Sequence, residues 1–205
     1  LGRERQDLKT HEFVDRLPIH SGGSRETDSP NPQGEYAMSC LGRERTFEHY
    51  SQCNQTPVSL LRLNYAVELR YGVLVDLAQR IMAGEAIDRS MAMCNVIWQR
   101  DANAVALRSL VHADSPPFVL NIAGPEQVSI ETVSRELAQR MGREANFTGE
   151  PQADAILSNG QKGHRLFGYP RLTLHEMLDH VAAWFASGGE VHGKLTKFEV
   201  RDGKF

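Results

Sequence analysis

The stretch Phe118-Val-Leu-Asn-Ile-Ala-Gly-Pro-Glu126 decides the fold class. Five mostly apolar residues that end at glycine and proline are typical of a buried strand, because those two residues interrupt regular backbone. Ser129 then stands at the position of a helix N-cap, and Val133, Leu137 and Met141 recur behind it at helical spacing. The stretch therefore predicts a strand, a turn and a helix in succession.

The same alternation continues on both sides of this stretch. Val58–Leu63, between Pro57 and Asn64, predicts a second buried strand, and Asn95–Trp98 predicts a short one. Helical spacing is found over residues 36–51, 71–83, 100–110, 158–167 and 174–185. Strands separated by helices need crossover connections, so the predicted class is α/β with a parallel sheet.

Composition and charge exclude several classes of protein. The 205 residues are 40% hydrophobic and 24% charged, as in ordinary globular proteins, and the net charge of −3 offers no basic surface for nucleic acid. The longest apolar run, over residues 71–78, is far shorter than the roughly 20 residues of a membrane span. The three cysteines show no CxxC spacing and the chain does not open with a signal peptide, so we expect a reduced, cytoplasmic protein.

Five segments carry a resemblance to a known family. Gly34-Glu-Tyr-Ala-Met-Ser-Cys40 resembles the tyrosine-x-x-x-lysine segment of extended short-chain dehydrogenases/reductases, of the epimerase/dehydratase type. Leu61-Arg-Leu-Asn-Tyr65 resembles the strand end that lies near the nicotinamide in that family. The segments that begin at Asn95, Phe118 and Leu157 resemble later parts of the same family in the same order.

The resemblance implies a fold and a function. The expected fold is a partial Rossmann-like parallel sheet with a C-terminal substrate-binding α/β portion. The expected activity is that of an NAD(P)-dependent oxidoreductase, epimerase or dehydratase acting on a sugar or sugar-nucleotide, in a homodimer. In that family the tyrosine, here Tyr36, exchanges a proton with the substrate oxygen, and Asn64 and Tyr65 stand where the family contacts NAD or NADP.

Two departures from the family pattern bear on activity. A dinucleotide site needs G-x-G-x-x-G between a strand and a helix, and this spacing does not occur in the 205 residues, so cofactor binding by this chain alone is not expected. Cys40 stands where the family has its lysine and supplies no cation to favour ionisation of the phenol. Arg43, one turn further, either reaches back over Cys40 to replace that cation and contact the cofactor, or is simply solvated.

Other candidate residues follow from position. Thr10 is the nearest hydroxyl to the family's third catalytic group, and Trp98 is a candidate for the substrate pocket. Arg62, Arg100 and Arg165 are candidates for binding the substrate's phosphates. No metal site is predicted, because the histidines of His175-Glu-Met-Leu-Asp-His180 are five residues apart and therefore about 140° apart around a helix.

The predicted organisation has four parts. Residues 1–35 are an irregular remnant of a nucleotide-binding half, and residues 36–70 hold the catalytic-type helix and the following strand. Residues 71–187 form the substrate-binding portion, and residues 188–205 a tail whose alternation over 197–201 predicts an edge strand. The leading hypothesis is the enzyme described above. The alternative is a non-catalytic remnant, or pseudoenzyme, that serves as a binding or structural subunit.

Overall fold

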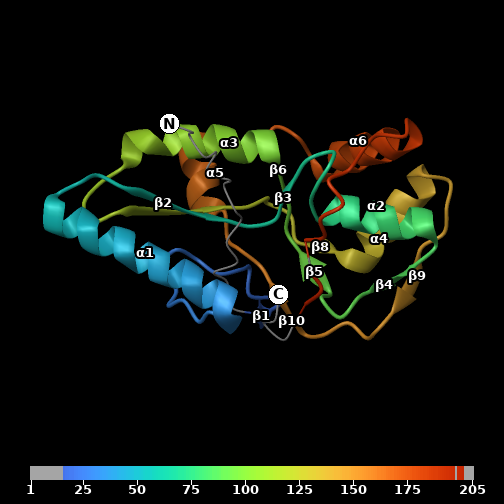
Figure 1. Cartoon of the computed structure of the whole chain (residues 1–205), viewed down its shortest axis with the longest axis horizontal. Helices are drawn as coiled ribbons and strands as arrows, with labels where there is room; N and C mark the ends of the chain where they lie inside the picture. The colour runs from blue at the N-terminus through green and yellow to red at the C-terminus, as the bar shows by residue number, and fades with distance from the viewer. Residues whose placement is uncertain (1–15, 197, 201–205) are drawn as a thin grey trace.

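The computed structural model describes residues 16–196 and 198–200 (Figure 1). The helices are α1 (Gly34–Asn54), α2 (Val73–Ala83), α3 (Gln99–Arg108), α4 (Ile130–Arg140), α5 (Gln161–Phe167) and α6 (Leu174–Ala186), with a 3-10 turn η1 (Ser109–His112) after α3. The strands are β1 (Arg16–Pro18), β2 (Ser59–Leu63), β3 (Ala66–Val67), β4 (Ala86–Asp88), β5 (Met93–Cys94), β6 (Ile97–Trp98), β7 (Phe118–Ile122), β8 (Val128–Ser129), β9 (Asn146–Thr148) and β10 (Asp154–Ile156).

One part of the molecule is built around a parallel strand pair. β2 and β7 run side by side, with Ser59 opposite Phe118 and Leu63 opposite Ile122. Helix α1 lies on one side of the pair, and α3 and α5 lie on the other (Figure 1). The parallel pairing confirms the α/β class and the strand assignments for residues 58–63 and 118–122.

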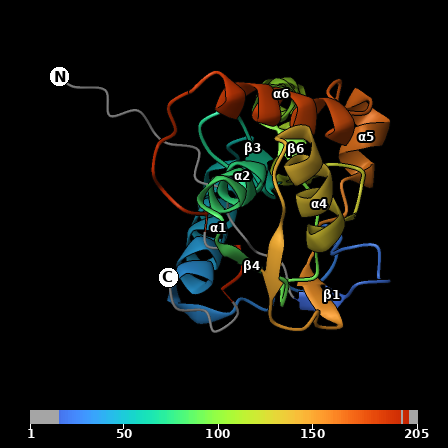
Figure 2. The same ribbon diagram turned by 90° about the vertical axis from the view of Figure 1, so that its right-hand side faces the viewer.

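The other part is built from α2, α4 and α6. These three helices pack on one another, and α6 crosses over the other two in the side view (Figure 2). Strand β4 pairs with β9 in parallel, and β5 pairs with β8 in antiparallel fashion. The main hydrophobic core lies here, because its largest fully buried side chains include Leu74, Leu77, Ile130, Leu137 and Leu178.

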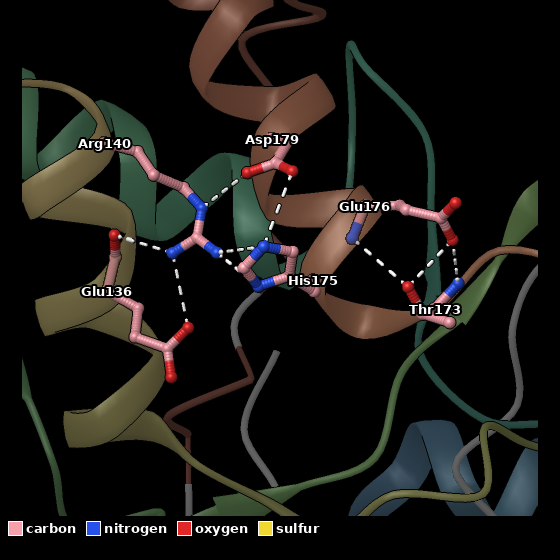
Figure 3. A network of polar contacts seen from close by, with 6 residues as sticks. All are labelled: Glu136, Arg140, Thr173, His175, Glu176 and Asp179. Carbon is pink, nitrogen blue, oxygen red and sulfur yellow. Dashed lines mark hydrogen bonds and ion pairs between the residues drawn. The ribbon is translucent and has the colours of Figure 1, made fainter.

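The helix ends follow from local chemistry. Ser129 caps α4, since its side chain accepts a hydrogen bond from the backbone N–H of Thr132 at 3.3 Å, as the sequence predicted. Helix α6 begins with a capping box, in which Thr173 and Glu176 each bond the other's backbone N–H (Figure 3). Helix α2 ends at Gly84, whose left-handed backbone favours glycine.

An arginine joins α4 to α6. Nε of Arg140 donates to Asp179 at 2.7 Å, one terminal nitrogen lies 2.6 Å from Nδ1 of His175, and the other contacts Glu136 (Figure 3). The Arg140 guanidinium lowers the pKa of the exposed Asp179 carboxyl below its usual value. His175 thus serves a helix–helix contact.

Two elements differ from the sequence prediction. Of the predicted strand over 95–98 only Ile97–Trp98 forms a strand, β6, because the Asn95 side chain turns inward between β5 and β6 to hydrogen-bond three other segments. The predicted helix over 158–167 begins only at Gln161, because Ser158 pairs with Ser24 in a parallel bridge.

The tail also differs. Over residues 188–196 and 198–200 no strand forms, and the tail crosses α2 instead of joining a sheet edge. Thr196 donates to the Asp76 carboxylate from both its backbone nitrogen (2.7 Å) and its hydroxyl (2.6 Å), and Glu199 pairs with Arg80. Phe198 is only 2% exposed and belongs to the main core. The predicted edge strand is therefore wrong for the described tail residues, because side-chain contacts with α2 replace backbone pairing.

In the described part of the chain, the model contains no helix of the length and apolarity that a membrane crossing requires.

Candidate functional site

The carboxyl ends of β2 and β7 form the candidate site. Ligands of open α/β sheets bind outside the carboxyl ends of parallel strands. Asn64 follows β2 directly, and its backbone N–H still bonds the carbonyl of Ile122, the last residue of β7, at 2.9 Å. Asn64 and Asn121 are both buried here, together with Asn95 and Ser158.

Helix α1 is fixed against β2 by an ion pair. Nε and one terminal nitrogen of Arg62 donate to the two carboxylate oxygens of Glu44, at 3.0 and 2.6 Å. The connection between α1 and β2 is short, so the two elements run in opposite directions. Tyr36 lies eight residues before Glu44, about 12 Å along the helix, and Asn64 lies about 7 Å beyond Arg62. Tyr36 and Asn64 therefore lie toward the same end of the packed pair of α1 and β2.

The inward face of α1 carries Cys40 but not Arg43. Ala37, Cys40, Glu44 and Ser51 are the buried residues of this helix, at the spacing of one face. Arg43 is exposed, which agrees with its solvated interpretation. Glu44 lies one turn beyond Cys40 on this face, and the guanidinium that it binds is that of Arg62 of β2. A cofactor-binding role for Arg43 stays a prediction.

A buried amide network joins three segments at the site. Nδ2 of Asn64 donates to Oδ1 of Asn95 at 2.6 Å. The Asn95 carboxamide also bonds the carbonyl of Gly124, after β7, and both backbone groups of Ser158. A side chain at Gly124 would collide with the carbonyl of Val96, since a Cβ there would lie 1.8 Å from that oxygen. The glycine that ends β7 is therefore required by close backbone packing.

A second network ties the segment before α1 to β7. The backbone N–H of Asn121 donates to Glu26 Oε1 at 2.9 Å, and its side chain donates to the carbonyls of Ser24 and Asn159. Gly23, at φ +83°, lies so close to residues 157–159 that a Cβ would meet the Ser158 carbonyl carbon at 2.8 Å. Gly23 is therefore required by the close approach of the two chain segments.

The remaining predicted residues are scattered. Tyr65 is buried with the main core, and Trp98 is half-buried with its ring centroid 6.2 Å from that of His180. Arg100 and Arg165 are exposed on α3 and α5. Thr10 lies outside the described residues. The substrate roles of Trp98, Arg100 and Arg165 stay predictions.

Several residues at the site were missed by the sequence analysis. Asn121 had a detectable signal, because it is an amide inside the apolar run Phe118–Ile122, where a buried polar group needs partners. Glu44 and Glu26 had no such signal, since their partners Arg62 and Asn121 are distant in sequence.

The described residues fit one side of a dinucleotide cofactor. Oδ1 of Asn64 is a buried acceptor with no hydrogen-bond partner among the described residues. Such an oxygen can accept a hydrogen bond from an amide or hydroxyl group of a ligand. Among those same residues no cluster of three or more His, Cys, Asp or Glu could hold a metal ion.

No protein-family model and no curated protein sequence matches this chain. Solved structures with the same fold include RMD from Pseudomonas aeruginosa complexed with NADPH, at 16% identity and a TM-score of 0.72, covering 86% of this chain and 64% of that one. UDP-glucose 4-epimerase from Thermus thermophilus, in complex with NAD, has 16% identity and a TM-score of 0.71, with 86% and 62% of the two chains covered. A dTDP-glucose 4,6-dehydratase from Bacillus anthracis, also with NAD, has 14% identity and a TM-score of 0.72, with 87% and 60% covered.

These likenesses confirm the fold that the sequence predicted, a Rossmann-like arrangement shared with epimerases and dehydratases. At 14–20% identity they establish the fold alone. The chain spans 55–64% of the length of these solved structures.

Proposed function

We propose that this chain forms the substrate side of an NAD(P)-dependent epimerase/dehydratase-like oxidoreductase that acts on a sugar or sugar-nucleotide. The observation that carries the proposal is the Glu44–Arg62 ion pair, which holds Tyr36 toward the same end of the packed pair of α1 and β2 as Asn64. A helix-borne phenol beside the carboxyl ends of parallel strands is the arrangement that this chemistry needs.

Each residue has a stated part in the proposal. The Tyr36 hydroxyl exchanges a proton with a substrate oxygen. Asn64 and Tyr65 lie where the nicotinamide end of the cofactor meets the sugar, so that Asn64 contacts the substrate as well as the cofactor. The cofactor, when bound, accepts or returns a hydride. Arg100 and Arg165 are exposed and bind the substrate phosphates, for which the guanidinium fork is suited.

The second candidate function is that of a non-catalytic binding or structural subunit. Cys40 favours it, because a buried thiol gives the Tyr36 phenol no positive field. The guanidinium that packs on this face from β2 does not supply that field freely, since Arg62 is held by the carboxylate of Glu44. The two candidates share a ligand site and differ in turnover.

Turnover separates the two candidates. The chain is assayed for hydride transfer with a panel of UDP-glucose, UDP-glucuronic acid and dTDP-glucose, with Tyr36→Phe as the test variant. NAD or NADP is supplied well above the dissociation constant of about 1 mM that we expect for this chain. Tyr50→Phe is the matched control, because Tyr50 is an exposed tyrosine of the same helix. Loss of turnover in Tyr36→Phe alone supports the enzyme; turnover that survives it removes Tyr36 from the chemistry.

The proposal includes a homodimer in the cytoplasm. Helix α1 exposes three large apolar side chains, Met38, Phe47 and Tyr50, each more than half exposed. Apolar surface on one helix is the kind of face that a second copy covers.

A further inference from the structure

Asn95 uses its whole carboxamide in buried hydrogen bonds. Only 2% of the residue is exposed, and it lies between β5 and β6. Its oxygen accepts from Asn64 Nδ2 at 2.6 Å and from the Ser158 backbone N–H at 3.2 Å. Its nitrogen donates to the carbonyls of Ser158 at 2.7 Å and Gly124 at 3.1 Å.

These four bonds allow only one orientation of the Asn95 carboxamide. A flipped amide would set its nitrogen against the two donors of Asn64 and Ser158, and its oxygen against two carbonyls. Each buried donor or acceptor left unmatched costs about 1–3 kcal/mol, so the flipped state is strongly disfavoured. The backbones around the site therefore fix where the Asn95 oxygen lies.

The fixed oxygen in turn orients Asn64. Asn64 must turn Nδ2 toward Asn95, which leaves its own Oδ1 as the group directed elsewhere. That oxygen is buried and has no partner among the described residues, in a residue that is 1% exposed. An amide held in this way presents an acceptor, so it matches a donor such as a hydroxyl or an amide N–H.

We propose that Asn95 is a positioning residue, which locks the Asn64 carboxamide so that its oxygen accepts from a donor group of the ligand. The identity of that ligand rests on the proposed function. The lock, by which we mean the fixed orientation of the Asn64 carboxamide, is a property of the chain without ligand. The fixed orientation and the identity of the ligand can therefore be refuted separately.

Hydrogen exchange of side-chain amides tests the lock in the full chain without ligand. In the ¹⁵N-labelled protein the Asn64 amide protons should exchange at least tenfold more slowly than those of Gln55, which is exposed and bonds only a local carbonyl. Asn95→Ala removes the acceptor at 2.6 Å and leaves only the Asn95 backbone carbonyl, at 3.4 Å from Nδ2. Because this remaining contact is long, the variant should lose the protection. Asn95→Asp keeps an oxygen that accepts from Asn64 and from the Ser158 N–H, so it should retain the protection. Both variants lose the bonds that Nδ2 donates to the carbonyls of Gly124 and Ser158.

Asn121→Ala is the matched control, because it removes a buried amide of the neighbouring network that does not bond Asn64. It should leave the Asn64 protons protected. Fast exchange of Asn64 in the wild-type chain overturns the lock, even if Asn95→Ala fails to fold. Protection that survives in a folded Asn95→Ala variant overturns it equally.

Titration with UDP-glucose tests the consequence for binding. Asn95→Ala and Asn64→Ala should each weaken binding about tenfold. The double variant should bind no more weakly than either single variant, because both changes act on the same acceptor, Oδ1 of Asn64. Full affinity in Asn95→Ala contradicts the positioning role. If the wild-type chain binds no member of the nucleotide-sugar panel, the proposed function fails, and the amide exchange alone decides the lock.

Discussion

Glu44 and Arg62 form a two-point ion pair between α1 and β2, with side chains that are only 9% and 12% exposed. The pair fixes how far α1 is shifted along the direction of β2, and this shift determines the position of Tyr36 relative to Asn64. It also places a carboxylate one turn beyond Cys40, on the face where the resembling family has a lysine. The electrostatic character of this face is therefore set by a neutral pair instead of a lone cation.

Breaking the Glu44–Arg62 pair should destabilise the protein strongly. Glu44→Ala leaves the guanidinium of Arg62 buried without its carboxylate, which typically costs about 3–5 kcal/mol. Glu48→Ala is the control, because the Arg45–Glu48 pair on the same helix is exposed and should contribute less than about 1 kcal/mol. Urea denaturation of both variants measures the difference. Equal losses would contradict a structural role for the buried pair.

Asp76 should make stability depend on pH. Burial raises the pKa of its carboxyl above the usual 3.8, and the hydrogen bonds from Thr196 lower it by less. The folded chain therefore holds this proton more tightly than the unfolded chain. The corresponding stability is present below the unfolded pKa and is lost as the pH rises through the raised folded pKa.

Asp76→Asn removes this titration and keeps an oxygen for Thr196 to bond. The free energy of unfolding of the variant, relative to the wild type, should therefore rise as the pH increases above 3.8, the usual pKa of this carboxyl. Urea denaturation across this range checks it. A difference between variant and wild type that stays constant with pH would argue that Asp76 keeps its usual pKa in the fold.

The cysteines should differ sharply in reactivity. Cys53 is exposed near the end of α1, whereas burial raises the pKa of the Cys94 thiol to about 12. Because the thiolate is the reactive form, iodoacetamide near neutral pH should modify Cys53 quickly and Cys94 only after unfolding. Mass spectrometry of peptides from wild type and Cys53→Ser gives the order of modification. Comparable rates at the two sites would refute the buried environment of Cys94.

The proposed dimer should depend on the exposed face of α1. Phe47→Asp places a charge beside Tyr50, the exposed aromatic residue one turn further along α1, and should shift the protein to a monomer in light scattering. Leu110→Asp is the control, because Leu110 is similarly exposed but lies on η1. A monomeric wild type, or equal dissociation by both variants, would refute dimerisation through α1.

The fold was largely predictable because its signals are local. The apolar run over residues 118–122, the cap at Ser129 and the stripe of α6 each depend on a few neighbouring residues. The prediction for the tail failed because the contacts that place it are distant in sequence. Alternation over residues 197–201 suggests pairing, but the burial of Phe198 and the Thr196–Asp76 contact depend on a helix about 120 residues earlier.

The site was predictable only in part. Tyr36 and Asn64 could be selected by resemblance, but their relation to one another depends on Glu44 and Arg62, which are ordinary charged residues in the sequence. The lock on Asn64 needs Asn95, Gly124 and Ser158, which three different connections bring together. Such contacts are products of topology, and periodicity in one chain cannot reveal them.

Binding of a nucleotide-sugar by the 205-residue chain tests the central claim most directly. Calorimetric titration with UDP-glucose, UDP-glucuronic acid and dTDP-glucose should give saturable binding for at least one of them, weakened about tenfold by Asn64→Ala. NAD and NADP should bind the same chain only weakly, with dissociation constants near or above about 1 mM, because its sequence has no glycine-rich phosphate loop. Absence of saturable binding for the whole panel, or binding that Asn64→Ala leaves unchanged, would contradict a substrate site at the carboxyl ends of β2 and β7.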